Sequence, residues 1–179
     1  SNLVEHPLKP YYDEINVNSK KANTIYLLGN LRYKPNILGI ESILLFFKND
    51  CNNLKDYLKQ KQINIKIVGY INKDLENQLR KKLIDYEISE YVKLIGPVNK
   101  IEAITYDALA TISYINSPYG RQTKDFDSVN LLLPILKFQN KLQDKFDNSF
   151  YGEKPYYIRF SNQNELINQI DKLLVHNYS

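Results

Sequence analysis

Residues 117–135, SPYGRQTKDFDSVNLLLPI, decide the fold that we expect for this chain. Residues 110–115, just before them, form a short apolar and β-branched run that is typical of a buried strand. Residues 134–138 have the same character and predict the next strand. Between the two runs, residues 124–133 carry apolar side chains at helical spacing, which predicts an amphipathic helix. The side chains expected to face the core are Phe126, Val129 and Leu132 or Leu133.

Other apolar runs along the chain repeat this alternation of strand and helix. Strands are expected at 24–28, 63–68, 91–95 and 156–160, and helices at 36–48, 73–86, 99–109 and 164–175. Residues 49–62 predict a helix tail or a second short helix, and a polar helical stretch is expected from 139 to 146. The alternation predicts an α/β domain, a Rossmann-like, doubly wound parallel sheet. We assign 24–179 to this domain and 1–23 to a lead-in or linker.

Two of the expected strand-to-helix loops combine glycine with cations. The first strand ends at Gly29, and Arg32 and Lys34 follow before the helix. In a parallel sheet such loops gather at one edge, where helix N-termini favour anions, so these cations are expected to bind phosphate together with Lys124. Gly69 and Gly96 close two further strands and are expected at that edge. The second loop adds Gly120 for close approach, Arg121 for charge, and Gln122 and Asp127 for hydrogen bonds to hydroxyls.

The second loop also resembles a known family. The pattern Gly-x-Gln-x-Lys-x-x-Glu, then a small-residue helix and Pro-Val, is similar to the donor loop of retaining GT-B-type glycosyltransferases. Asp127 stands in place of the family's ribose-binding glutamate, and the small residues are Ser128 and Asn130. The first loop resembles the family's first phosphate-contacting loop. The matching positions are Gly120, Gln122, Lys124, Asp127, Pro134 and Ile135 in the second loop, and Gly29, Arg32 and Lys34 in the first.

The resemblance implies the C-terminal, donor-binding half of a GT-B enzyme of the group 1, family 4-like kind. Such an enzyme transfers a sugar from a nucleotide-diphosphate sugar to an acceptor, with no cofactor and no metal. Arg32, Lys34 and Lys124 would neutralise the leaving diphosphate. A glycan, lipid or protein acceptor would bind an N-terminal domain that this chain lacks, so the chain alone is expected to be inactive. The residues expected to contact the donor are Gly29, Asn30, Gly69, Val98, Gly120, Arg121, Gln122, Thr123 and Asp127.

Two alternatives stay open at this point. A degenerate, non-catalytic Rossmann-like scaffold would keep the fold and lose the donor, and the shorter Asp127 favours it. A flavodoxin-like binder of a nucleotide or phospho-ligand would need a complete pocket of its own. The sequence contains neither a GxGxxG nor a Walker A motif, which argues against dinucleotide dehydrogenases and P-loop enzymes. Asp125 and Asp127 raise the alternative of a hydrolase, but acidic residues in a first helical turn favour a structural role for Asp125.

Composition narrows the remaining classes of function. The chain is 43% hydrophobic and 25% charged, typical of a globular domain, and its net charge of +4 is spread out, which argues against nucleic acid. Cys51 is the single cysteine, and His6 and His176 lie at opposite ends, so no metal site is expected. No apolar run reaches the roughly 18 residues that span a bilayer. We expect a cytoplasmic enzyme of glycan biosynthesis, and peripheral membrane contact through the full-length protein stays open.

Overall fold

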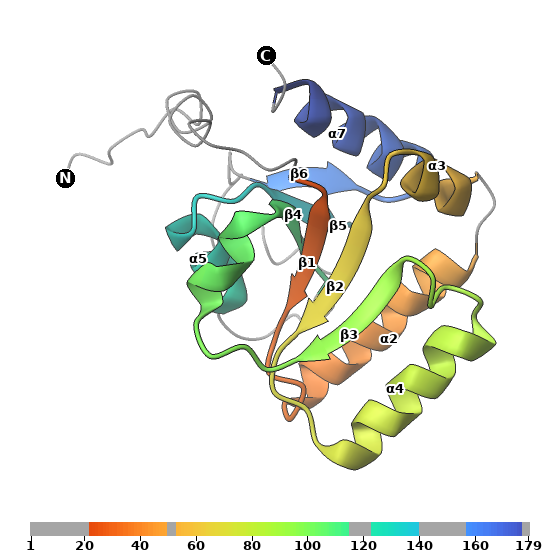
Figure 1. Cartoon of the computed structure of the whole chain (residues 1–179), viewed down its shortest axis with the longest axis vertical. Coiled ribbons are helices and arrows are strands. Elements are labelled where there is room, and N and C mark those ends of the chain that lie inside the picture. The colour runs from red at the N-terminus through yellow and green to blue at the C-terminus, as the bar shows by residue number, and fades with distance from the viewer. Residues whose placement is uncertain (1–21, 50–52, 115–122, 140–156, 177–179) are drawn as a thin grey trace.

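The computed structural model describes residues 22–49, 53–114, 123–139 and 157–176. They form a six-stranded sheet of order β3-β2-β1-β4-β5-β6, in which every neighbouring pair is parallel (Figure 1). The strands are β1 (Thr24–Leu28), β2 (Asn64–Val68), β3 (Val92–Gly96), β4 (Ala108–Ser113), β5 (Ile135–Phe138) and β6 (Tyr157–Phe160). The helices are α2 (Lys34–Lys48), α3 (Leu54–Gln60), α4 (Lys73–Asp85), α5 (Thr123–Asn130) and α7 (Gln163–His176), with a 3₁₀ helix η1 (Ile101–Tyr106).

Helices cover both faces of this sheet, which makes it doubly wound (Figure 1). On one face the main core joins the strands to buried side chains of α2, α3, α4 and α7, for example Ile40, Leu58 and Ile170. On the other face a smaller cluster joins Tyr26 and Leu28 of β1 to η1 and the end of α5. The strand order reverses direction between β1 and β4, which is where ligands bind in sheets of this kind. The predicted Rossmann-like α/β class is therefore confirmed.

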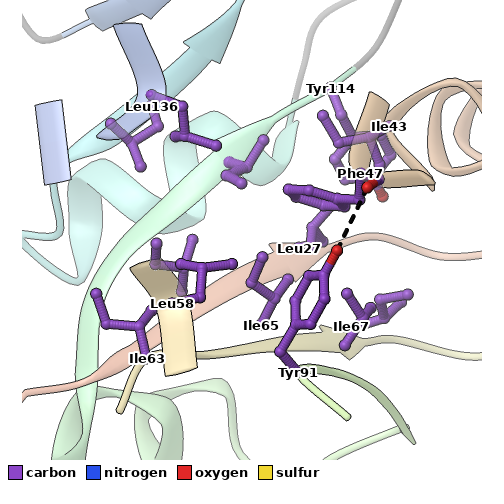
Figure 2. Close-up of a cluster of buried hydrophobic side chains, with 14 of the residues drawn as sticks. Leu27, Ile43, Phe47, Leu58, Ile63, Ile65, Ile67, Tyr91, Tyr114 and Leu136 are labelled. Atoms are coloured by element: carbon purple, nitrogen blue, oxygen red, sulfur yellow. Dashed lines mark hydrogen bonds between the residues drawn. The ribbon is translucent and has the colours of Figure 1, made fainter. Parts of the chain in front are cut away.

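The main core explains why the central strands are rich in buried apolar residues. Every residue of β1 is buried, as expected for a parallel strand covered on both faces. Figure 2 shows Leu27 of β1 and Ile65 and Ile67 of β2 gathered around Phe47 of α2. The Tyr91 hydroxyl, just before β3, donates a hydrogen bond of 3.3 Å to the carbonyl oxygen of Phe47. The core thus holds the C-terminal end of α2 against the strands.

Most of the predicted elements are confirmed, with boundaries shifted by a residue or two. Pro35 lies in the first turn of α2, and the Asn72 side chain caps α4 by accepting a hydrogen bond of 2.9 Å from the Leu75 backbone N–H. Residues 49–62 contain a separate helix, α3. The helix expected at 99–109 is wrong in length, because only η1 forms and Leu109 belongs to β4. The lead-in at 1–21, Cys51, His6 and the helix expected up to residue 146 lie outside the described residues.

The prediction for the buried face of α5 is wrong. Phe126 is 51% exposed and Val129 is exposed as well, whereas Lys124, Asp125 and Ser128 are buried. The reason lies in the sheet, which presents polar side chains to α5: Thr111 and Ser113 of β4 and Lys137 of β5. The Thr111 hydroxyl donates to Ser128 Oγ at 2.8 Å, and the Ser113 hydroxyl donates to Asp125 Oδ2 at 3.0 Å. A polar sheet face thus selects the polar side of the helix.

Two absences apply to the described residues only. None of the described helices is both long enough and apolar enough to cross a membrane. No group of three or more His, Cys, Asp or Glu side chains suited to a metal ion occurs within 22–49, 53–114, 123–139 and 157–176.

Candidate functional site

The loops that follow β1, β2 and β3 are tied together at the carboxyl edge of the sheet. The Gly29 N–H donates to the Val68 carbonyl at 3.0 Å, and the Gly69 N–H donates to the Gly96 carbonyl at 2.9 Å. A Cβ on Gly69 would lie 1.6 Å from the Gly29 carbonyl oxygen, so the two loops touch backbone to backbone. The expected meeting of Gly29, Gly69 and Gly96 at one edge is confirmed. Gly120, which was expected beside them, lies outside the described residues.

A cavity of about 550 Å³ opens at this edge, at the reversal of strand order. Its walls come from the ends of β1 and β2, the residues after β3, the start of α2 and the first turn of α5. Six of the predicted site residues line it, namely Lys124 and five of the residues expected to contact the donor: Gly29, Asn30, Gly69, Val98 and Asp127. The other lining residues are Leu28, Tyr33, Asn36, Val68, Tyr70, Pro97 and Ile101. The cavity thus combines apolar walls with a few polar groups, as small-molecule sites do.

The other predicted site residues lie around this cavity or beyond the described part of the chain. Arg32 does not line the cavity. Its guanidinium stacks 3.5 Å above the ring centre of Tyr70, and Tyr70 is one of the lining residues. Lys34 is exposed on the first turn of α2 and does not line the cavity either. Gly120, Arg121 and Gln122 lie outside the described residues, and Thr123 is described only as the first residue of α5. The structure therefore brings Lys124, but not Arg32 or Lys34, into the lining.

Lys124 is the buried cation of the cavity. Its side chain is 7% exposed, and its Nζ lies 3.6 Å above the ring centre of Tyr114. No hydrogen-bond partner for this Nζ exists among the described residues. Burial lowers the pKa of Lys124 to about 7, with Asp125 opposing the shift and Lys137 adding to it. The amine of Lys124 is thus shielded from solvent beside the cavity and has no competing hydrogen-bond acceptor among the described residues.

Asp125 is held away from the cavity by hydrogen bonds below α5. Its Oδ2 accepts from the Ser113 hydroxyl at 3.0 Å and from the Tyr157 hydroxyl at 2.6 Å. The Lys137 Nζ donates to the same Ser113 Oγ at 3.3 Å. These bonds join α5 to β4, β5 and β6. The structure therefore gives Asp125 a structural role, which fixes the first turn of α5 and with it the position of Lys124.

Sequence reasoning missed two residues that shape the cavity through backbone contacts. The Asn36 side-chain amide donates to the Asn30 carbonyl at 2.8 Å and so closes the loop after β1. The Tyr114 hydroxyl donates to the Leu28 carbonyl at 2.9 Å, and its ring supports Lys124. The place of Tyr114 directly after a buried strand was a usable signal, because residues there lie at the ligand edge. Asn36 gave no comparable signal, since it was interpreted only as a helix start.

Comparison with solved structures identifies the fold. No protein-family model matches the sequence, and no curated protein matches it either. A variant of Staphylococcus aureus TarM, solved with fondaparinux, α-GlcNAc-glycerol and UDP, aligns at a TM-score of 0.59 and 16% identity, over 91% of this chain and 31% of that one. A glycosyltransferase from Rickettsia africae aligns at a TM-score of 0.56 and 13% identity, over 97% of this chain and 43% of that one. The pneumococcal O-GlcNAc transferase GtfA, solved with UDP and GlcNAc, aligns at a TM-score of 0.51 and 14% identity, over 91% of this chain and 30% of that one.

At these identities the likeness concerns the fold. The chain spans less than half the length of each of these three proteins. The sheet order, the helices on both faces and the alignments all indicate the same fold. The chain therefore has the Rossmann-like α/β fold of one half of a GT-B glycosyltransferase.

Proposed function

We propose that this chain is the donor-binding half of a glycosyltransferase, which transfers a sugar from a nucleotide-diphosphate sugar to an acceptor. The observation that carries the proposal is the cavity at the strand reversal, where Lys124 and Asp127 face the loop of Gly29. TarM and GtfA, which share the fold, were solved with UDP. The proposed partner is therefore a nucleotide sugar.

The parts of the cavity suit the parts of such a ligand. The side chains of Leu28, Val68 and Val98 offer an apolar wall for a nucleobase. The carboxylate of Asp127 can accept hydrogen bonds from ribose hydroxyls. The amine of Lys124 and the positive end of the α2 dipole favour the diphosphate. All of these groups border the same cavity.

The proposed chemistry follows from where negative charge develops. When the glycosidic bond to the donor breaks, the electron pair goes to the leaving diphosphate. Lys124 would stabilise that charge from within the cavity, and Arg32 and Lys34 would do so from the neighbouring loop. The proposal includes no metal. The acceptor, a role in glycan biosynthesis and a cytoplasmic location belong to the same proposal.

Titration of nucleotides tests the donor site. Replacing Lys124 by alanine is expected to weaken the binding of UDP or GDP by about tenfold or more, because charge-assisted hydrogen bonds contribute roughly 1.5–3 kcal/mol each. Alanine at Arg32 or Lys34 is expected to weaken binding less, since both lie outside the cavity lining and water screens exposed charges. Calorimetric titration of each variant measures these differences.

The matched control is Lys172→Ala on α7, a lysine exposed on the far helix. This substitution removes the same charge and should leave the affinity nearly unchanged. Equal affinities for the wild type, Lys124→Ala and Lys172→Ala would contradict the proposal. So would the absence of binding at millimolar nucleotide, a result that would favour the non-catalytic scaffold.

A second expected result concerns turnover. The chain by itself is expected to transfer no sugar, because in the proposed enzyme the acceptor binds a second domain across the cleft. The assay is incubation of the chain with a nucleotide sugar and candidate acceptors, with mass spectrometry of the products. Formation of a glycoside by residues 1–179 alone would show that the acceptor site is already present.

A further inference from the structure

The region below α5 contains more buried positive than buried negative charge. Among the described residues it holds the lysines Lys124 and Lys137, which are 7% and 1% exposed, and one carboxylate, Asp125, which is 5% exposed. Ionised side chains are rarely buried unless they are paired, because water solvates them far better than protein does. Each of these lysines is therefore expected to have a partner for its charge.

The hydrogen bonds show which lysine shares the carboxylate. The Ser113 hydroxyl accepts from the Lys137 Nζ and donates to Asp125 Oδ2, so it links these two charges. Asp125 Oδ2 also accepts from the Tyr157 hydroxyl. The Nζ of Lys124 is buried and has no such partner in the described part of the chain, and Lys124 is one of the residues that line the cavity. Lys124 is therefore the lysine whose amine has no hydrogen-bond acceptor among the described residues.

The other described groups around Lys124 do not supply a buried negative charge. Tyr114, just after β4, contributes a ring face, and burial raises the pKa of its hydroxyl, so it stays protonated. Tyr33 and Tyr70 contribute their side chains to the cavity lining. Asp127 lines the cavity too, but it is exposed, and water screens its charge.

Building on the proposed function, we propose that an anionic ligand enters this cavity together with a proton, which the amine of Lys124 takes up. The proton comes from solvent and forms the fourth bond of the Lys124 nitrogen, so above the pKa of free Lys124 the ammonium group forms as the ligand's diphosphate arrives to balance it. Burial lowers this pKa to about 7, so the free amine is mostly neutral at pH 8. Binding and protonation are then linked, since each favours the other.

The linkage predicts how affinity depends on pH. Below the pKa of free Lys124 the amine is already charged, and affinity should be flat. Above it, each bound ligand must bring a proton, so the dissociation constant should rise by up to about tenfold per pH unit. A site with a permanently charged lysine would show no such slope between pH 7 and 9.

The experiment measures proton uptake directly. Wild-type chain is titrated calorimetrically at pH 8 with UDP-N-acetylglucosamine and with GDP-mannose, in buffers of different ionisation enthalpy. Nucleotide sugars are the right probes because their diphosphate has no free terminal phosphate, whose second pKa of about 6 would itself titrate. We expect uptake of close to one proton at pH 8 and of almost none at pH 6.

Variants assign the proton to its residue. Lys124→Arg keeps a charge at every pH and should bind without proton uptake, and Lys172→Ala should match the wild type. Binding of either nucleotide sugar with no uptake at pH 8 and a flat affinity from pH 6 to pH 9 would overturn the inference and leave the proposed function intact. Absence of binding at every pH would overturn both. The wild-type titration decides between these outcomes even if Lys124→Arg fails to fold.

Discussion

Replacing Lys124 by methionine is expected to make the chain more stable while it weakens nucleotide binding. Methionine keeps the length and the apolar stem of lysine but removes an amine that has no hydrogen-bond partner among the described residues. Exchanging buried ionic groups for apolar ones of similar volume often stabilises proteins by about 1–4 kcal/mol. Each kcal/mol corresponds to a rise of roughly 2–4 °C in melting temperature for a chain of this size. Urea unfolding of the two proteins measures the difference.

The difference in stability between the wild type and Lys124→Met depends on pH, and the direction of this dependence can be derived. Burial lowers the pKa of Lys124 from 10.5 to about 7 in the folded state, so the unfolded chain binds more protons between these values. The stability of the wild type therefore rises with pH across that window, and the advantage of Lys124→Met is largest near pH 6 and shrinks towards pH 10. Lys137→Met is the matched control, because it removes a lysine that hydrogen-bonds Ser113 and should destabilise the chain. A Lys124→Met variant less stable than the wild type at pH 6 would contradict this account.

A second large effect is expected from Gly69→Ala. The added Cβ would lie 1.6 Å from the Gly29 carbonyl oxygen, and the backbone φ of Gly69 is +154°. The overlapping atom is the Gly29 carbonyl oxygen, which belongs to the backbone of the loop after β1, so rotation of a side chain cannot relieve the overlap. We expect the free energy of unfolding to fall by about 3 kcal/mol or more, with loss of the cavity's shape. Urea unfolding and nucleotide titration of the variant measure the two consequences.

Gly96→Ala provides the comparison for that result. Gly96 also has a positive φ, +87°, but a Cβ there would meet open space. The loss in the free energy of unfolding for Gly96→Ala should be limited to backbone strain, about 1–2 kcal/mol. Equal losses for the two variants would mean that the close approach of the loops of Gly29 and Gly69 contributes nothing beyond strain.

The sequence predicted the sheet well, for a reason that can be stated. The strands β1, β2 and β4 lie in the centre of a parallel sheet, so most of their residues are buried and most of those are apolar or β-branched, and such runs are easy to recognise. The loop glycines then mark where these runs stop. Because parallel strands end at one edge, the prediction that Gly29 and Gly69 meet followed from topology alone, and the structure confirms it.

The orientation of α5 could not be predicted in the same way. Helical periodicity identifies Phe126 and Val129 as one apolar stripe, but it does not say whether the surface beneath the helix is apolar. That surface is set by β4, β5 and β6, where Ser113, Lys137 and Tyr157 come together from distant parts of the sequence. Only tertiary structure reveals that Asp125 belongs among them.

For the candidate site too, some features could be predicted from local sequence and others depend on tertiary structure. Lys124 and Asp127 were predicted from their loop, and both line the cavity. Arg32 was predicted from its loop as well, but its stacking on Tyr70 depends on a contact between two loops that the sequence does not encode locally. The roles of these residues in donor binding stay predictions until the titrations are made.

The contact between the loops of Gly29 and Gly69 also limits how the cavity can adapt to a ligand. The two loops are joined by backbone atoms at van der Waals range and share the hydrogen bonds of adjacent strands, so they move as one rigid floor. The opposite wall is the first turn of α5, whose attachment to the sheet runs through side chains. We therefore expect any change in the width of the cavity to come from displacement of that wall, with the floor as the fixed reference.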